Sequence, residues 1–307
     1  MIKASSEESL SSAATLLKNG EIVAIPTETV YGLGANALDT NAVKKIFSLK
    51  GRPSSNPLII HTFTIEIIKS LISESCEKKT LNRLEKIKSL WPGPLTVILP
   101  KSDKVPDIVT AGSKNFAVRI PSHPVALDLL RKVALPIAAP SANLSTYISP
   151  TTAEHVNEAF GDKIRLIIDG GPCEIGIEST VVSLIGENPV ILRPGYITKE
   201  KLESILDENV LLKNSTSKTR DNVDSPGQML QHYSPKTPCS LVSDAKDFKK
   251  TVASNKALFS LGPVFIKDTS LFSHIEVLSS SGDLEEVSEK LFNKLRNLDK
   301  KNFDHIY

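Results

Sequence analysis

Short apolar runs alternate with amphipathic stretches of helical period over roughly the first 200 residues, and this alternation restricts the fold more than any other feature. Buried strands are expected at 22–25, 57–61, 95–99, 116–120, 137–139 and 166–168. Helices are expected at 5–19, 39–49, 78–90, 124–133 and 152–159. Residues 179–185 and 190–192 predict a β-hairpin joined across 186–189. The pattern predicts the α/β (α+β) class, with a mixed sheet and flanking helices.

The alternation stops in a polar and then proline-containing stretch, residues 207–238, which we interpret as a linker between domains. We therefore expect a first domain over 1–206 and a small α/β domain over 239–307. In the second domain, strands are expected at 240–243, 257–261 and 274–278, with helices at 244–253 and 283–298. Residues 303–307 indicate the start of a further strand where the chain stops, so this domain is expected to be truncated.

Composition narrows the class of protein without identifying a function. The 307 residues include 37 basic and 35 acidic side chains, and a net charge of +2 does not indicate a general nucleic-acid binder. Cys76, Cys173 and Cys239 are far apart and form no CxxC pair, which argues against a disulfide framework or a cysteine zinc site. The first residues lack the apolar core of a signal peptide, and no apolar run approaches membrane-spanning length. A cytoplasmic protein with no membrane segment is expected.

The stretch Ser48–Asn56 is the strongest candidate for an anion site. The sequence contains neither GxxxxGK[ST] nor GxGxxG, so a nucleotide would have to be held in another way. Lys50 and Arg52 lie among glycine, proline, serine and asparagine, and this combination of cations and small donors suits a triphosphate. Cations that merely offset a helix dipole are the alternative. That alternative explains Lys44 and Lys45 well, but Arg52 lies beyond the helix.

Polar groups also follow the buried strands, where α/β sheets commonly bind ligands. Thr27, Glu28 and Thr29 serve either as ligand groups or as capping and turn residues, and the two alternatives are about equal. Gly32-Leu-Gly34, taken alone, predicts only a turn.

Three other polar sites carry open alternatives. Arg119 lies inside an apolar strand and needs an anionic partner, which is either a structural carboxylate or a carboxylated substrate. His61 ends a strand, where a lone histidine is more often a structural hydrogen bonder than a catalyst. Ser141 and Asn143 follow the strand at 137–139 and either cap a helix or bind phosphate.

Taken together, several segments resemble the YrdC-type domain of threonylcarbamoyl-AMP synthases. They run in the family's order and with its spacing: 26–37 (PTETVYGLGANA), 46–61, 91–99, 116–124, 136–145, 169–182 and 191–195. Residues 225–238 (SPGQMLQHYSPKTP) resemble the linker of the two-domain form. The resemblance implies a YrdC-like twisted mixed sheet, followed by a smaller Rossmann-like α/β domain.

The same resemblance implies an activity and a set of site residues. The reaction joins L-threonine, bicarbonate and ATP, with Mg²⁺, to give threonylcarbamoyl-AMP and pyrophosphate for modification of the adenosine beside the tRNA anticodon. By the family pattern, threonine would lie among Thr29, His61, Arg119, Ala139 and Ser179. ATP would be bound by Lys50, Arg52, Asn56, Asn115, Ser141, Asn143, Ser149, Arg193 and Tyr233. Lys50 and Arg52 would stabilise the developing charge, and no side chain is assigned as a metal ligand.

The resemblance also implies partners, and it has two departures. The product would pass to the tRNA threonylcarbamoyl-transferase complex, and a direct tRNA contact is possible. Thr146-Tyr147 stands where the family usually has a glycine, which affects the loop that carries Ser149, and the second domain looks short. The alternative function is a non-catalytic YrdC-like module that binds double-stranded RNA or tRNA. A carbamoyl-adenylating role in hydrogenase maturation would be expected to bring cysteine zinc motifs, which the sequence lacks.

Overall fold

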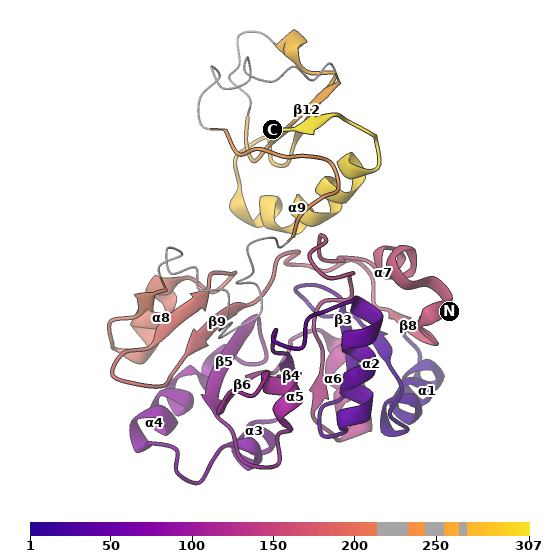
Figure 1. Cartoon of the computed structure of the whole chain (residues 1–307). Helices are drawn as coiled ribbons and strands as arrows, with labels where there is room; N and C mark the ends of the chain where they lie inside the picture. Colours follow the sequence, from indigo (N-terminus) through magenta and orange to yellow (C-terminus); the bar gives the residue numbers. More distant parts are fainter. Residues whose placement is uncertain (214–232, 243–254, 264–268) are drawn as a thin grey trace.

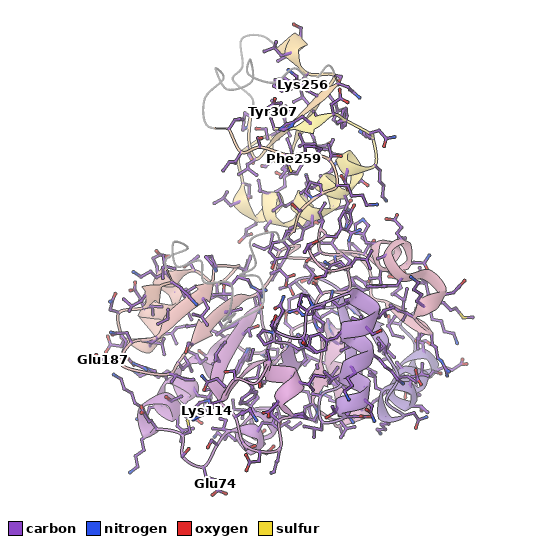
Figure 2. The ribbon with its side chains drawn as sticks, in the orientation of Figure 1. Glu74, Lys114, Glu187, Lys256, Phe259 and Tyr307 are labelled. Carbon is purple, nitrogen blue, oxygen red and sulfur yellow. The ribbon has the colours of Figure 1, made fainter. Side chains whose placement is uncertain are left out.

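The computed structural model describes residues 1–213, 233–242, 255–263 and 269–307, and these form two bodies (Figure 1). The larger body contains an eleven-stranded sheet and the smaller one a three-stranded sheet. Figure 1 shows the smaller body above the larger one, with the long C-terminal helix facing it. In Figure 2, Lys256, Phe259 and Tyr307 mark the smaller body, whereas Glu74, Lys114 and Glu187 lie toward the opposite end of the molecule.

The large sheet is mixed, as the sequence predicts. Its strands are β1 (Ile2–Ala4), β2 (Val23–Ile25), β3 (Gly32–Asn36), β4 (Ile59–His61), β5 (Leu95–Pro100), β6 (Asn115–Arg119), β7 (Ile137–Ala138), β8 (Leu166–Asp169), β9 (Thr180–Ser183), β10 (Val190–Arg193) and β11 (Leu211–Leu212). They lie in the order β1-β8-β2-β3-β7-β4-β6-β5-β9-β10-β11. The predicted hairpin is confirmed, because β9 and β10 pair antiparallel. β11 lies beyond the expected domain end at residue 206 and pairs with β10, so it belongs to the large sheet.

Helices pack against this sheet and bury an apolar face against it. They are α1 (Glu7–Lys18), α2 (Thr40–Lys50), α3 (Ile65–Leu71), α4 (Lys78–Ile87), α5 (Asp107–Thr110), α6 (Pro124–Val133), α7 (Ala153–Phe160) and α8 (Lys199–Leu206), with short 3₁₀ turns at Lys88–Leu90 and Gly161–Lys163. The five expected helices are confirmed. Asp39 caps α2, and Gly51, with φ of +59°, ends it, because a left-handed residue cannot continue the helix.

The glycines at 32 and 34 do not form the turn that the sequence predicts. They lie in strand β3, which pairs antiparallel with β2. A Cβ at Gly34 would lie 3.1 Å from Cγ2 of Ile137, and one at Gly32 would lie 3.2 Å from Cβ of Ala139. The glycines therefore let neighbouring strands pack closely, and the turn lies earlier, between Pro26 and Tyr31.

The smaller body contains a parallel sheet of β12 (Lys256–Ser260), β13 (His274–Val277) and β14 (His305–Ile306), the 3₁₀ turn Thr269–Leu271 and the long helix α9 (Leu284–Asp299). These elements confirm the predictions for 257–261, 274–278, 283–298 and 303–307. The strand expected at 240–243 is not found in its described residues, 240–242. The residue before them, Cys239, forms an isolated β-bridge with Ile306. The helix expected at 244–253 lies outside the described residues, as do residues 214–232 of the linker.

The two bodies meet where α9 crosses the loops of the larger one (Figure 1). Val30 and Ile148 of the larger body pack with Phe292 of α9. At Gly176, which has φ of +74°, a Cβ would lie 2.5 Å from the backbone oxygen of Ser288. The interface therefore includes a direct backbone approach that only glycine permits. Within the described residues, no helix is long and apolar enough to cross a membrane.

Candidate active site

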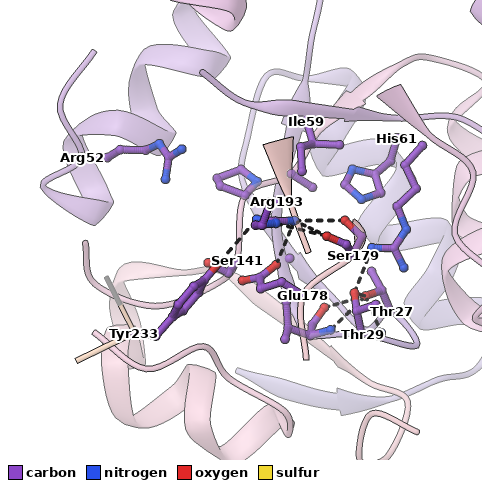
Figure 3. A pocket seen from close by; sticks show the side chains of 15 residues that line it. Thr27, Thr29, Arg52, Ile59, His61, Ser141, Glu178, Ser179, Arg193 and Tyr233 are labelled. Atoms are coloured by element: carbon purple, nitrogen blue, oxygen red, sulfur yellow. Dashed lines mark hydrogen bonds and ion pairs between the residues drawn. The ribbon is translucent and has the colours of Figure 1, made fainter. Parts of the chain in front are cut away.

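The loops that follow the strands enclose a pocket (Figure 3). One of its lining residues, Tyr233, stacks on Phe292 of α9. β4 and β6 run parallel in register, which places His61 opposite Arg119 at the ends of their strands. Gly32 forms a bridge with Ser141 and brings the loop after β7 to the same place. The lining residues are Thr27, Thr29, Val30, Gly32, Arg52, Ile59, His61, Arg119, Ala139, Pro140, Ser141, Glu178, Ser179, Arg193 and Tyr233.

Arg119 has the anionic partner that its apolar strand requires, and this partner is Glu28. Nη2 of Arg119 lies 2.6 Å from Oε1 of Glu28, and both side chains are buried. Nη1 donates to Oγ1 of Thr29 at 2.9 Å, and Nε donates to the Gly93 carbonyl at 3.2 Å. Burial raises the pKa of Glu28, but the charge and hydrogen bond of Arg119, with backbone N–H groups, outweigh it and lower the pKa overall. Glu28 therefore stays ionised and fixes the guanidinium.

His61 is buried beside this ion pair. Burial and the nearby charge of Arg119 lower the pKa of His61 to about 3. The imidazole is therefore neutral at physiological pH and contributes hydrogen bonding rather than charge.

Lys50 supports the loop after β7 from behind the pocket. Its ammonium donates to the Ser141 and Asn143 carbonyls, each at 2.5 Å. Complete burial, with Arg52 nearby, lowers the pKa of Lys50 well below its ordinary value. The side-chain amide of Asn143 donates in turn to the Leu144 and Tyr147 carbonyls. Lys50 and Asn143 thus hold the shape of the loop that presents Ser141.

Arg52 lines the pocket itself. Its Nη2 donates to Oδ1 of Asn56 at 2.6 Å and to the Pro57 carbonyl at 2.8 Å, and its Nε donates to the Asn56 carbonyl. Burial lowers the pKa of Arg52 to about 10, so the guanidinium keeps its charge at neutral pH. Asn56 therefore orients Arg52 toward the pocket.

Arg193 lies between the two sides of the pocket, with Arg52 on one side and His61 on the other (Figure 3). Its Nε and Nη2 donate to the Ser179 carbonyl at 3.1 Å and 2.9 Å. Nη2 also donates to the Ser179 hydroxyl at 3.0 Å. Its Nη2 lies 3.8 Å from Oε2 of Glu178, whose Oε1 accepts from the Ser149 hydroxyl at 2.7 Å. Nη1 of Arg193 donates to the Tyr233 hydroxyl at 3.4 Å. Two loops and the linker therefore converge on Arg193.

Most of the residues named from the sequence meet at this pocket. Those that line it are Thr29, Arg52, His61, Arg119, Ala139, Ser141, Ser179, Arg193 and Tyr233. Lys50, Asn56, Asn143 and Ser149 lie behind it and hold lining residues or their loops. Asn115 does not join them: it begins β6, four residues before Arg119, or roughly 13 Å along the strand. Its neighbour Lys114 lies toward the end of the large body away from α9 (Figure 2).

Sequence reasoning missed one acid at the site and left the role of another open. Glu178 lines the pocket, and Glu28, which was left open between ligand and turn residue, holds Arg119. The available signal was charge balance, because a carboxylate is the common partner of a buried arginine. Glu178 directly precedes Ser179, which the sequence did single out. Among the described residues no group of three or more metal-ligating side chains occurs.

The fold and this pocket, which three arginines line, define an α/β protein whose site suits small anionic molecules. A family profile described as "Telomere recombination" matches residues 15–195, and one described as "Threonylcarbamoyl-AMP synthase, C-terminal domain" matches residues 197–307. Threonylcarbamoyl-AMP synthases of Pyrococcus abyssi and Bacillus subtilis are each 42% identical, over 96% and 97% of this chain and 86% of theirs. The chain belongs to the threonylcarbamoyl-AMP synthase family, in its two-domain form, and it is an enzyme that makes threonylcarbamoyl-AMP.

Solved structures agree with this assignment. The crystal structure of Pyrococcus abyssi Sua5 complexed with L-threonine matches 100% of this chain and 91% of its own, with a TM-score of 0.88 and 39% identity. Escherichia coli YciO matches 64% of this chain and 95% of its own, at 20% identity and a TM-score of 0.55, which shows the fold alone. The predicted fold class and family are thereby confirmed.

Proposed function

We propose that the pocket binds L-threonine on the side of Arg119 and His61 and ATP on the side of Arg52 and Arg193. The observation that carries this proposal is that three arginines and five hydroxyl side chains face one pocket. An amino-acid carboxylate and a triphosphate both need charged and forked donors of this kind. The two substrates would then meet near the centre of the pocket.

The threonine side is rigid before substrate arrives. Glu28, Thr29 and Gly93 fix Arg119, so the fork of its guanidinium is oriented for the threonine carboxylate. Neutral His61 can accept from or donate to threonine without adding charge, and Ala139 and Ser179 complete this side. Glu28 already neutralises the charge of Arg119, so the threonine carboxylate adds a further negative charge. The guanidinium N–H groups that are not bonded to Glu28, Thr29 or Gly93 would stabilise this charge.

The ATP side supplies positive charge where the reaction needs it. Bicarbonate adds to the uncharged threonine amine with loss of water and gives a carbamate. A carbamate oxygen then attacks the α-phosphate of ATP, pyrophosphate leaves, and the mixed anhydride threonylcarbamoyl-AMP remains. This transfer depends on in-line positioning and charge neutralisation. We assign neutralisation to Arg52 and Arg193, phosphate hydrogen bonding to Ser141, and support of that loop to Lys50 and Asn143.

The roles of Asn115 and Mg²⁺ depend on where the nucleotide lies. Asn115 contacts ATP only if the nucleotide reaches along β6, away from the pocket. Mg²⁺ usually binds together with ATP, coordinated by the phosphates and by one or two protein carboxylates. The carboxylate of Glu178 lines the pocket beside Arg193 and fits this need. When bound, Mg²⁺ would supply additional neutralisation of phosphate charge.

Tyr233 of the linker is proposed to cover the bound nucleotide. Its ring stacks on Phe292 of α9 with centroids 5.5 Å apart, and its hydroxyl meets Arg193. A cover at this place would exclude water from the carbamate and from the mixed anhydride, which both hydrolyse readily.

We further propose that tRNA contacts a basic depression outside the active site. Lys44, Lys45, Lys163 and Arg165 line it, together with Glu21 and Asp162. Clustered lysine and arginine side chains suit a phosphate backbone. The double variant Lys44→Glu and Lys163→Glu should weaken tRNA binding in a low-salt filter assay, and unchanged binding would refute this surface. The cytoplasmic location and the hand-over to a transferase complex stay predictions.

The central experiment measures pyrophosphate release from ATP by the purified full-length chain. Release should require both L-threonine and bicarbonate, and omission of either should abolish it. Arg52→Ala should lower the rate at least about tenfold, equivalent to about 1.4 kcal/mol of transition-state stabilisation. Arg131→Ala is the matched control, because Arg131 is exposed and, within the described residues, its one ion pair is with Asp128 of its own helix. Pyrophosphate release that does not depend on threonine would refute the proposed function.

A further inference from the structure

The second body reaches into the active-site loops through one buried charged side chain, Arg296 of α9. Arg296 is only 2% exposed, although it belongs to the smaller body. Its Nη2 donates to the Ile148 carbonyl at 2.5 Å and its Nε to the Ser149 carbonyl at 3.3 Å. Its guanidinium also lies 4.8 Å from the centre of the Tyr147 ring. All of these partners belong to the larger body.

The energetic setting of Arg296 is unusual for a side chain that merely fills an interface. Among the described residues no ion pair joins it to a carboxylate, and the charges of Glu158 and Asp299 offset only part of its loss of hydration. Burial lowers its pKa, because the charged form loses hydration. Burying a cation against carbonyls costs several kcal/mol unless those hydrogen bonds are well made. An apolar side chain, such as Phe292 one turn earlier, closes the same interface without that cost. The forked guanidinium donates to two successive carbonyls at once, which an apolar side chain cannot do.

The loop that Arg296 holds needs an external support. Thr146 has φ of +71°, a left-handed conformation that is unfavourable for a β-branched residue. The linker contributes a further contact, because the Ser234 N–H donates to the Thr146 carbonyl at 2.9 Å. The Tyr147 hydroxyl donates to Oδ2 of Asp299 at 2.7 Å, which adds a second tie from α9. Strain of this kind persists only where the surroundings fix the conformation.

The held loop leads directly to the ATP side of the pocket. Arg296 binds the carbonyl of Ser149, and the hydroxyl of Ser149 donates to Glu178 at 2.7 Å. Glu178 lines the pocket and lies 3.8 Å from Arg193. The hydrogen bonds of Arg119, on the threonine side, go to Thr29 and Gly93 and do not involve this loop.

We propose that Arg296 is a positioning residue for ATP, through which the second body sets the geometry of the active site. Its guanidinium fixes the backbone at Ile148 and Ser149, and Ser149 then fixes the carboxylate of Glu178 beside Arg193. This inference rests on the proposed assignment of Arg193 to ATP. It predicts a selective defect: loss of Arg296 impairs the use of ATP and leaves threonine recognition intact.

The test compares steady-state constants of Arg296→Met and Arg296→Lys in the full chain. Arg296→Met keeps an unbranched apolar stem like that of arginine and removes the guanidinium donors, so the KM for ATP should rise at least about tenfold. The KM for threonine, measured at saturating ATP, should change less than about twofold. Arg296→Lys keeps the charge but loses the fork, so an intermediate rise of about threefold is expected.

Two controls separate positioning from general destabilisation. Asn297→Ala changes an exposed neighbour whose amide donates to Asn293 of the same helix, and this variant should behave as the unmodified chain. Leu298→Ala opens a cavity in the small-body core, so it should lower Tm and leave the KM for ATP normal.

The possible failures are distinguishable. If the unmodified chain releases no pyrophosphate, the proposed function fails. If it is active and both Arg296 variants keep its KM for ATP, the positioning role is overturned, whatever their Tm. Should Arg296→Met not fold, Arg296→Lys alone decides between the same two outcomes.

Discussion

The buried ion pair between Glu28 and Arg119 gives the sharpest quantitative prediction. Both side chains are nearly inaccessible to water, at 2% and 3% exposure, and their closest N and O atoms are 2.6 Å apart. Glu28→Gln removes the negative charge and leaves a buried guanidinium without its counter-ion. Breaking such a pair costs about 3–5 kcal/mol. For a domain of this size each kcal/mol lowers Tm by about 2–4 °C, so a fall of roughly 6–20 °C is expected.

The pH dependence follows from the direction of the pKa shift. The pKa of Glu28 is lower in the folded protein than its ordinary value of 4.5. The stabilisation is therefore complete above pH 4.5 and is lost as the pH falls through the folded-state pKa. The difference in unfolding free energy between the unmodified chain and Glu28→Gln should then narrow at acid pH.

Calorimetric melts at several pH values, with a double-variant cycle, test this reasoning. Glu28→Leu combined with Arg119→Met should recover most of the stability that either single change loses, because no unpaired charge remains. Glu85→Gln is the matched control: this glutamate also pairs with lysines, but on an exposed surface, so the change should cost less than about 1 kcal/mol. The account would be refuted if Glu28→Gln lost no more stability than Glu85→Gln. It would also be refuted if the double variant lost the sum of the stabilities that the two single variants lose.

Three further predictions concern the pocket and its loops. Arg119→Lys should weaken threonine binding at least about tenfold by calorimetry, since the fork is lost although the charge remains, and unchanged affinity would argue against the carboxylate assignment. Thr146→Gly should raise stability in denaturant unfolding by about 0.5–1 kcal/mol, whereas Ser145→Gly, at a residue without positive φ, should lower it; the reverse order would show that the loop is not strained. Tyr233→Ala should lower affinity for an ATP analogue at least about tenfold, while Tyr233→Phe, which keeps the stack on Phe292, should lose far less; equal losses would mean that the contact with Arg193, rather than the cover, matters.

The sequence predicts the architecture well where side-chain periodicity is strong. The helices expected at 5–19, 39–49, 78–90, 124–133, 152–159 and 283–298 are found because their apolar positions repeat with the helical period. The strands expected at 95–99 and 116–120 are found because each is a short, almost continuous apolar run. β3 is missed because two of its five residues are glycines, which carry no side-chain pattern and resemble a turn. β1 and β11 are short edge strands with exposed residues, and such segments give no buried periodicity.

The site is predictable in its residue types but less so in its pairings. An arginine in an apolar strand requires an acid, yet only the fold brings Glu28 to Arg119. The separation of Asn115 and Arg119 follows from strand geometry alone, since four residues of extended chain cannot share a small site. Arg296 gives a signal as well: it follows Phe292 by one helical turn, so it lies on the face that α9 buries.

The backbone contact at Gly176 constrains how the two halves of the chain can diverge. A side chain there would meet the main-chain oxygens of Ser288 and Glu289, and every residue type at those positions presents the same oxygens. Substitutions on that face of α9 therefore cannot relieve a clash at 176, while their own side chains remain free to vary. In a chimera, any helix of the same path should dock against a partner that retains this glycine. In a chain of this fold that lacks the second body, no helix backbone would clash with a side chain at position 176. Glycine would then be favoured there only because of the positive φ, which is a weaker preference.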